Sequence, residues 1–495
     1  MSTPQPSPDH KIWERARLAR DARFDGRFYI GVRTTGIYCR PICPANSPKR
    51  ENIQYFPTAA AAGEAGYRPC LRCRPECAPG TPAWSGTSTT VRRGLRLIAG
   101  GALDDGDIEQ LADRLGVTSR HLRRLFTKHL GASPLAVAHT QRLHFAKRLV
   151  DDTRLPMSHV ASAAGYGSVR RFNDAFRKTW GRTPRALRKD RDDTPPSDRA
   201  ATLTLRMPCR LPYDWPAMLE FLAARATPGV EEVSGTQYRR TLAFGDEHGV
   251  IEVLPAREPG FLALSVRSVA TRNLFDVMQR GREAFDLDAP VGDITAALRR
   301  DPVLRKLIRG NAGVRVPGSW DGFELTVRAI LGQQISVKAA TTMAGRIAQA
   351  YGMPLRLAAG AADSQLTRVF PTAAELERAP FTDIGLVRSR AETIRRLAAA
   401  VVQGDVTFDP TQDPQEFCKA LCSIKGIGDW TAQYVAMRVL KYPDAFPASD
   451  LGLLKALERP SRLTPAELQS RAEAWRPWRA YAAQLLWGSL KDSGG

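Results

Sequence analysis

The sequence predicts a multidomain α+β fold: a small cysteine-rich domain, an all-α domain with tandem helix-turn-helix modules, a small antiparallel α+β domain and a mostly α-helical domain. Three observations predict this order. At 495 residues the chain is too long for one hydrophobic core. Paired cysteines occur within the first 80 residues, and a basic, helical pattern follows them. Beyond residue 200 apolar residues alternate in period two, and beyond about residue 290 the helical pattern returns.

The charge of the chain predicts a polyanionic partner. Lys and Arg number 72 against 51 Asp and Glu, which gives a net charge of +21 and favours nucleic acid or an anionic membrane surface. No apolar run approaches the roughly 20 residues that span a bilayer, and the basic residues are spread along the chain. We therefore expect DNA and no membrane. The opening MSTPQPSPDHK lacks the apolar core of a secretory signal, so we expect a cytoplasmic protein with reduced thiols.

Composition and periodicity divide the chain into segments. The acidic, proline-containing stretch DDTPPSDRA, Asp192 to Ala200, predicts the clearest linker. The expected division is a cysteine-rich domain at 1–80, a basic helical domain at 91–190, a linker at 191–202, an α+β domain at 203–290 and a helical domain at 291–495.

Four cysteines form two pairs that predict a metal site. Cys39-x3-Cys43 and Cys70-x2-Cys73 are separated by 26 residues, and four thiolates with this spacing suit one tetrahedral Zn²⁺ per chain. A structural zinc knuckle without chemistry is the simplest interpretation of the spacing alone. Thiolate character at neutral pH adds a second possibility, because such a sulfur can attack a methyl group on an uncharged phosphate triester. An ordinary phosphate diester is negative and would be repelled.

The basic helical region contains an internal repeat. DIEQLADRLGVTSRHLRRLFTKHLGASP and PMSHVASAAGYGSVRRFNDAFRKTWGRTP share their order of features about 50 residues apart. Each has a short apolar helix, a glycine turn (Gly116, Gly165) and a serine placed to cap a second helix (Ser119, Ser168). Two such copies predict tandem helix-turn-helix modules.

The second helix of each module carries the candidate DNA contacts. Arginine reads guanine edges or holds phosphates, and a solvated basic helical domain is the alternative. The candidates near the helix starts are Arg120, Arg123, Arg124, Arg170 and Arg171.

A glycine hairpin near the C-terminus predicts a second DNA contact. In LCSIKGIGDWTAQY, Gly426 and Gly428 permit a tight turn between two helices. The second helix would then begin with exposed backbone amides near Asp429 to Thr431. Such amides can hold a DNA phosphate without reading sequence, although a plain helix connection is the alternative. Twenty residues beyond Trp430, the proline-containing loop of FPASDLGLL ends in Asp450.

The N-terminal motifs resemble a known family. VRTTGIYCRPICP, RENIQYF and GYRPCLRCRPE resemble the N-terminal domain of Ada adaptive-response proteins over about 75 residues. The resemblance implies that Cys39 accepts a methyl group irreversibly from a DNA methylphosphotriester, and that Cys39, Cys43, Cys70 and Cys73 hold the zinc. The region at 91–190 resembles the AraC-type DNA-binding domain of the same proteins. Together these imply a methylation-triggered transcriptional activator that binds promoter DNA and RNA polymerase.

An Ada protein is expected to continue into a guanine O6-methyltransferase domain, but the proline-cysteine-histidine motif of that domain does not occur in this sequence. We therefore expect no such activity.

The C-terminal half resembles a different family. LPYDWPAMLEFLAARA, VRAILGQQIS and AWRPWRAYAAQLLW, together with the hairpin and Asp450, resemble the AlkA type of 3-methyladenine DNA glycosylase of the helix–hairpin–helix superfamily over roughly residues 203 to 490. The resemblance implies that the chain acts on double-stranded DNA, that Asp450 is its catalytic residue and that aromatic side chains line the pocket for the base. Trp430 stands where bifunctional lyases carry a lysine, so no lyase activity is implied. The position that wedges into the helix, usually leucine, is Gln334.

The resemblance also assigns the pocket, whose expected residues are Trp430, Tyr434, Trp487 and Phe221. An alkylated purine is cationic and stacks on electron-rich rings, whereas core packing is the alternative for each ring. Capping the helix at Leu451 is the alternative for Asp450.

The prediction is a fused Ada–AlkA protein that repairs methylphosphotriesters, binds DNA as an activator and excises 3-methyladenine- and 7-methylguanine-type bases. The first alternative is a transcription regulator whose glycosylase-like domain only binds DNA. The second is a glycosylase of another base preference, such as uracil or hypoxanthine.

Overall fold

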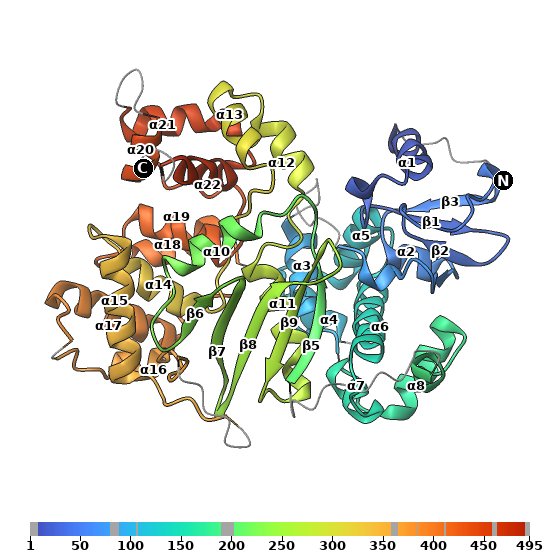
Figure 1. The fold of residues 1–495 in the computed structure, drawn as a ribbon, viewed down its shortest axis with the longest axis horizontal. Coiled ribbons are helices and arrows are strands. Elements are labelled where there is room, and N and C mark those ends of the chain that lie inside the picture. The colour runs from blue at the N-terminus through green and yellow to red at the C-terminus, as the bar shows by residue number, and fades with distance from the viewer. Residues whose placement is uncertain are drawn as a thin grey trace. The chain divides into compact units, whose positions relative to one another are not determined.

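The computed structural model describes residues 8–79, 89–104, 107–189, 202–357, 365–382, 384–409, 412–457 and 463–490. The chain divides into two compact units (Figure 1). Unit 1 comprises Met1–Arg210 with Ala270–Gln279, and unit 2 comprises Leu211–Val269 with Arg280–Gly495. The expected linker lies outside the described residues up to residue 201.

A mixed sheet forms the cysteine-rich part of unit 1, with strand order β3-β1-β2-β4. Strand β1 (Tyr29–Val32) pairs antiparallel with β2 (Ile37–Cys39) and with β3 (Ile53–Phe56). Strand β2 pairs in parallel with the short β4 (Arg68–Pro69). This parallel pairing matters for the site, because it places the end of β2, which is Cys39, beside the turn that follows β4 and begins at Cys70.

Both predicted helix-turn-helix modules are present in unit 1. The first consists of α4 (Ile108–Arg114) and α5 (Ser119–Leu130), and the second of α7 (Met157–Ala163) and α8 (Val169–Trp180). The turn glycines adopt positive φ, +67° at Gly116 and +73° at Gly165, a conformation that only glycine adopts readily. The long helix α6 (Pro134–Asp152) connects the modules and packs against α3, α5 and α7 (Figure 1).

The predicted caps hold for one module and fail for the other. Ser168 caps α8 and accepts a hydrogen bond from the amide of Arg171. Helix α5 is capped by Thr118, whose hydroxyl accepts from the amide of His121, so the prediction of Ser119 is wrong. The sequence presents two adjacent hydroxyls there, and the helix begins one residue earlier than the repeat alignment predicts.

The remaining elements of unit 1 complete its core. Phe126, Phe172 and Phe176 are fully buried, as expected for packing residues. The other helices and strands with their bounds are α1 (Pro8–Leu18), η1 (Ala22–Phe24), η2 (Arg50–Asn52), α2 (Ala59–Glu64), η3 (Pro75–Cys77), α3 (Thr89–Ala99), α9 (Pro184–Lys189), β5 (Thr202–Pro208) and η4 (Thr271–Asn273).

The strands of unit 2 pair antiparallel, as the alternating pattern predicts. Strands β6 (Glu231–Ser234), β7 (Gln237–Phe244), β8 (Glu247–Pro255) and β9 (Phe261–Arg267) pair in sequence order. Helix α10 (Trp215–Ala223) packs on β6 and β7.

Helices form the rest of unit 2 (Figure 1). They are α11 (Leu274–Ala284, which begins in unit 1), α12 (Val291–Leu298), α13 (Pro302–Gly310), α14 (Gly322–Leu331), α15 (Val337–Tyr351), α16 (Ala373–Glu377), α17 (Arg388–Gln403), α18 (Pro414–Cys422), α19 (Asp429–Arg438), α20 (Leu451–Ala456), α21 (Pro465–Ala472), η6 (Glu473–Trp475) and α22 (Arg479–Ser489). Within the described ranges no helix is both long enough and apolar enough to cross a bilayer.

Candidate functional site

The structure brings the four predicted cysteines into one cluster. The sulfur atoms of Cys39, Cys43, Cys70 and Cys73 all lie within 4.8 Å of one another. Sulfurs that surround zinc at its usual bond length of ~2.3 Å are roughly 3.8 Å apart, so a small closure of the cluster accommodates the ion. The donor set of four thiols therefore suits one Zn²⁺. Cys39 is only partly buried, whereas Cys73 is buried.

Neighbouring groups orient and polarise the cluster. The Arg40 amide donates a hydrogen bond to the Cys73 sulfur at 3.4 Å, and its guanidinium donates to the Cys73 carbonyl at 3.0 Å. The same guanidinium forms an ion pair with the buried carboxylate of Asp25. Hydrogen bonding from Cys39 lowers the pKa of Cys43 to about 7. The same hydrogen bonding raises the pKa of Cys39 and of Cys73, so the thiolate character of Cys39 depends on a bound Zn²⁺.

Buried polar contacts attach the cysteine-rich part of unit 1 to helix α6. The Tyr38 hydroxyl, next in sequence to Cys39, lies 3.1 Å from Nε2 of His144. Burial lowers the pKa of His144 to about 3, so its ring is neutral. Arg74, next to Cys73, donates to the buried carboxylate of Asp151 at 2.6 Å. Residues next to Cys39 and Cys73 thus attach the cysteine cluster to the helix that joins the two helix-turn-helix modules.

We expect metal analysis of the purified chain to find one zinc ion. Replacing Cys73 with alanine leaves three thiol ligands, and the zinc content should then fall well below one per chain. The melting transition of unit 1 should move to lower temperature, because metal binding is coupled to folding. Cys422→Ala is the matched control, since Cys422 is an exposed thiol in unit 2. Unchanged zinc content in the Cys73 variant would contradict the assignment.

The predicted DNA-contacting arginines are all exposed, and they lie in the first half of their helices. Among them, Arg123 approaches Glu109 at 3.9 Å and Arg124 lies 3.1 Å from the ring of His121. These surface contacts contribute little stability and leave the guanidinium groups accessible. The exposed set is Arg120, Arg123, Arg124, Arg170 and Arg171.

In unit 2, Asp450 lies in a large cavity and is held by three donors. The indole N–H of Trp430 donates to Oδ2 at 2.7 Å, and that of Trp487 donates to Oδ1 at 2.9 Å. The amide of Leu453 also donates to Oδ1 at 2.9 Å, so Asp450 does cap helix α20. Capping alone does not need the two indole contacts, which orient the carboxylate in the cavity.

The predicted aromatic residues share this cavity, which has a volume of about 1820 Å³. Single-ligand pockets hold roughly 300–1,000 Å³, so the space suffices for a nucleotide with its flanking backbone. The rings of Trp430 and Tyr434 are parallel, with centroids 5.4 Å apart, and Trp487 meets Tyr434 edge-on. All three are only partly buried, so they present ring surface to the cavity.

Two arginines form a cationic side of the same cavity. The guanidinium of Arg225 lies 3.8 Å from the ring centroid of the buried Phe221, and that of Arg438 lies 5.0 Å from it. Arg438 also donates to the Tyr434 hydroxyl at 2.7 Å. Although burial opposes the change, Arg438 and Arg225 lower the pKa of Tyr434. The cavity therefore combines one carboxylate, several π faces and two guanidinium groups.

The glycine hairpin joins α18 to α19 as predicted. Gly426 has a φ of +102°, and a Cβ there would lie 2.1 Å from Thr393 Oγ1, so a side chain does not fit. Gly428 starts α19 without a side-chain cap and has open space around it. Thr431, by contrast, is only 2% exposed, and its hydroxyl accepts from Gln333 at 3.1 Å. Thr431 as a residue is therefore buried, and a phosphate contact through its amide stays a prediction.

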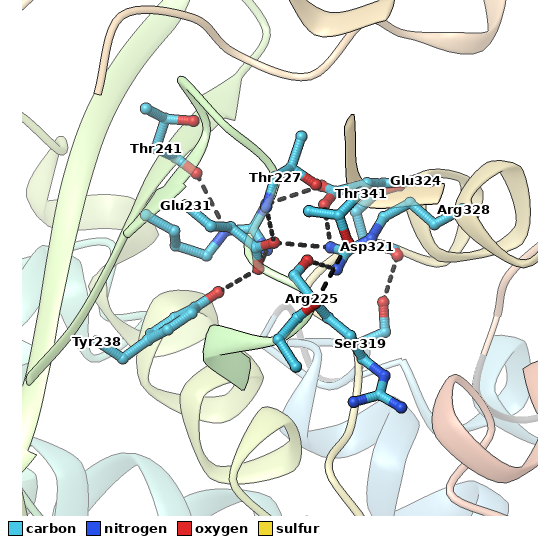
Figure 2. A network of polar contacts seen from close by, with 12 residues as sticks. Arg225, Thr227, Glu231, Tyr238, Thr241, Ser319, Asp321, Glu324, Arg328 and Thr341 are labelled. Atoms are coloured by element: carbon cyan, nitrogen blue, oxygen red, sulfur yellow. Dashed lines mark hydrogen bonds and ion pairs between the residues drawn. The ribbon is translucent and has the colours of Figure 1, made fainter. Parts of the chain in front are cut away.

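A buried charge network (Figure 2) holds the turn that follows α10, the helix that carries Phe221. Arg328 donates to Glu231 at 2.8 Å, to Glu324 at 3.0 Å and to the Arg225 carbonyl. Arg240 also donates to Glu324, at 2.8 Å. Although burial opposes it, Arg328 and Arg240 lower the pKa of Glu231 to about 2. Removing one partner would leave a buried unpaired charge, at a cost of about 3–5 kcal/mol.

Sequence reasoning did not identify several residues of this site. Arg438 follows the pocket residue Tyr434 by four positions on α19, so the i,i+4 rule could have found it. Arg225 follows Phe221 by the same spacing but lies in the turn after α10. The contact between Gln333 and Gly426 joins segments 93 residues apart, and no local sequence pattern predicts it.

Comparisons with known families match four consecutive parts of the chain. Residues 12–76 match the metal binding domain of Ada, and residues 111–190 match a helix-turn-helix domain. Residues 204–321 match the AlkA N-terminal domain, and residues 327–480 match the HhH-GPD superfamily of base excision DNA repair proteins.

Individual proteins resemble the chain over its full length or over its second half. A Mycobacterium tuberculosis protein, "Probable bifunctional transcriptional activator/DNA repair enzyme AlkA", is 42% identical over 96% of both chains. DNA-3-methyladenine glycosylase 2 of Escherichia coli is 35% identical and covers 56% of this chain and 94% of its own length. The solved 3-methyladenine DNA-glycosylase of Archaeoglobus fulgidus shares the fold, with a TM-score of 0.51 at 23% identity over 58% of this chain and 98% of that one.

Proposed function

The chain belongs to the family of bifunctional Ada–AlkA transcriptional activators and DNA repair enzymes, and on that premise we propose which residues perform each task. It repairs methylphosphotriesters through an Ada-type cysteine domain and excises 3-methyladenine through an AlkA-type glycosylase domain. The observation that carries this function is 42% identity over 96% of both chains to the bifunctional relative. We propose one domain for each task. Residues 1–80 repair methylphosphotriesters and residues 91–190 bind the promoter. Residues 203–290 support the base pocket and residues 291–495 excise the base.

Cys39 is the proposed methyl acceptor. Zn²⁺, when bound, keeps the four sulfurs as thiolates at neutral pH. The Cys39 sulfur attacks the methyl carbon of a methylphosphotriester, so that an S–C bond forms and the C–O bond breaks. The bonding electrons leave with oxygen, which becomes the anion of an ordinary phosphodiester. Cys39, Cys43 and Cys70 are all partly exposed, whereas Cys73 is buried, so exposure is compatible with Cys39 and the family resemblance selects it. The uncharged triester can approach a thiolate that repels a charged diester.

The reaction changes the charge of the site that DNA approaches. A Cys39 thiolate becomes a neutral thioether, which removes one negative charge beside helix α6 and its two helix-turn-helix modules. Because affinity for DNA depends on phosphate electrostatics, we expect the methylated chain to bind promoter DNA more tightly than the unmethylated chain. Titration of both forms at one salt concentration measures the difference, which should shrink at high salt. Equal affinities at low salt would contradict the switch.

Asp450 is the proposed catalytic group of the glycosylase. As the C1′–N bond breaks, its electron pair leaves with the alkylated base and positive charge develops on the sugar. The carboxylate stabilises that charge, and it orients or deprotonates the water whose oxygen bonds to C1′. Trp430, Tyr434 and Trp487 provide ring faces for the flipped cationic base. The hairpin at Gly426 and Gly428 holds a DNA phosphate through the uncapped amides of α19.

Release of free bases tests this function. Randomly methylated duplex DNA incubated with the chain should yield free 3-methyladenine, detected by mass spectrometry. A chain whose second half only binds DNA would release none. The 7-methylguanine-type bases are the further proposed substrates, and RNA polymerase in the cytoplasm is the proposed partner of the methylated activator.

A further inference from the structure

The loop between α14 and α15 holds a strained polar residue at the edge of the base cavity. Gln334 has a φ of +57°, in the left-handed region that disfavours residues other than glycine. Its side chain is exposed, and it lines the same cavity as Asp450 and Trp430. Strained backbone of this kind persists only where the surroundings determine it and is concentrated at functional sites.

The residues on both sides of Gln334 are fixed. The Gln333 side chain donates to the Gly426 carbonyl at 3.0 Å and to Thr431 at 3.1 Å. Arg390 donates to the Gln333 carbonyl. On the other side, Ser336 caps α15 by accepting from the Ala339 amide at 3.2 Å. The loop is therefore tied to the hairpin that meets the DNA backbone, while the side chain of Gln334 remains free to meet the duplex.

The resemblance to AlkA-type glycosylases implies that the residue at position 334 enters the gap left by the extruded base, and we propose that in this chain the amide of Gln334 also hydrogen-bonds the Watson–Crick edge of the orphaned partner base. The inference rests on the proposed glycosylase function. A primary amide has one acceptor oxygen and two N–H donors, so it can pair with the edge of thymine or, after rotation, of cytosine. Thymine stands opposite an alkylated adenine and cytosine opposite an alkylated guanine, so the single residue Gln334 can pair with the partner base of either lesion.

The amide chemistry distinguishes this role from simple space filling. An apolar side chain in the gap would stack against neighbouring bases, but it would leave the donors and acceptors of the orphaned base unpaired, which costs free energy. The uncharged amide also distinguishes Gln334 from a phosphate contact, for which Lys or Arg is the favoured residue. Gln334 should thus make binding depend on whether a base stands opposite the lesion.

Binding to a stable abasic analogue tests the proposal. The probes are duplexes of one sequence with tetrahydrofuran opposite thymine, opposite cytosine, or opposite a second tetrahydrofuran. The full chain is used, because its helix-turn-helix contacts contribute equally to every duplex and cancel in the ratio of dissociation constants. We expect the unmodified chain to prefer an opposing base by roughly 3- to 10-fold, the contribution of one or two hydrogen bonds.

Gln334→Leu keeps the size of the side chain and removes the amide, so it should bind the three duplexes with equal affinity. Gln334→Ala should also lose the preference and should bind all three more weakly. Gln403→Leu, an exposed glutamine at the end of α17 and away from the cavity, is the matched control and should retain the preference. A preference that survives in both Gln334 variants, or that is absent from the unmodified chain, would overturn the proposal.

Release of 3-methyladenine by the same preparations distinguishes a failure of the glycosylase function from a failure of the proposed Gln334 contact. If the unmodified chain releases no 3-methyladenine, the glycosylase function fails. If release occurs while the opposite-base preference does not depend on Gln334, only the reading of the partner base fails.

Discussion

Replacing Asp450 with asparagine should lower the rate of 3-methyladenine release by about 100-fold or more. Asparagine keeps the size of the side chain and an oxygen that can still cap α20, so the chain should fold and bind DNA. It lacks the negative charge that stabilises the cationic sugar. Its NH₂ group would also face an N–H donor, because Asp450 accepts from Trp430 and Trp487 on different oxygens.

The rate is measured under single-turnover conditions with methylated duplex DNA, alongside DNA binding and thermal unfolding. Ser449→Ala is the matched control, because Ser449 is an exposed hydroxyl in the same loop and carries no charge. This variant should keep a rate close to that of the parent. Excision by Asp450→Asn at the parental rate would refute the mechanism, and it would leave helix capping as the only role of Asp450.

Replacing Cys39 with serine should abolish methyl uptake while leaving base excision unchanged. A serine hydroxyl is not ionised at neutral pH and is a weak nucleophile without a base to activate it. The glycosylase residues lie in unit 2 and use none of the four cysteines. Peptide mass spectrometry after exposure to methylated DNA locates the methyl group.

Cys43→Ser separates the acceptor from its neighbouring ligands. It should weaken zinc binding, but any methyl group that the protein still takes up should be on Cys39. Methyl groups found on Cys43 of the unmodified chain, or on no cysteine, would contradict the assignment of Cys39.

Local patterns and long motifs made much of this architecture predictable. The two cysteine pairs, the repeated glycine turns and the GIG hairpin each depend on a few residues close in sequence, and the structure contains all three. The failure at Ser119 also has a local cause, since Thr118 beside it caps equally well. The assignment of Asp450 rests on the resemblance to AlkA-type glycosylases, whose essential aspartate follows such a loop, and its catalytic role stays a prediction.

The residues that sequence missed are those whose roles arise only in three dimensions. Arg328 reaches Glu231 across 97 residues, and Gln333 reaches the hairpin across 93. Trp430 precedes Asp450 by 20 residues and Trp487 follows it by 37, and each lies on a different helix. The sequence therefore placed both rings in the pocket but did not predict their hydrogen bonds to Asp450. Such contacts determine how rigidly the site is held, and periodicity carries no information about them.

The central claim is that one chain carries two independent repair activities, and a single mass-spectrometric measurement tests it most directly. Methylated duplex DNA is incubated with the unmodified chain, and the same reaction is analysed for free bases and for modified peptides. We predict free 3-methyladenine together with one methyl group on the Cys39 peptide. Asp450→Asn should lose only the first signal, and Cys39→Ser should lose only the second. Loss of both signals in either variant, or absence of one from the unmodified chain, would contradict the claim.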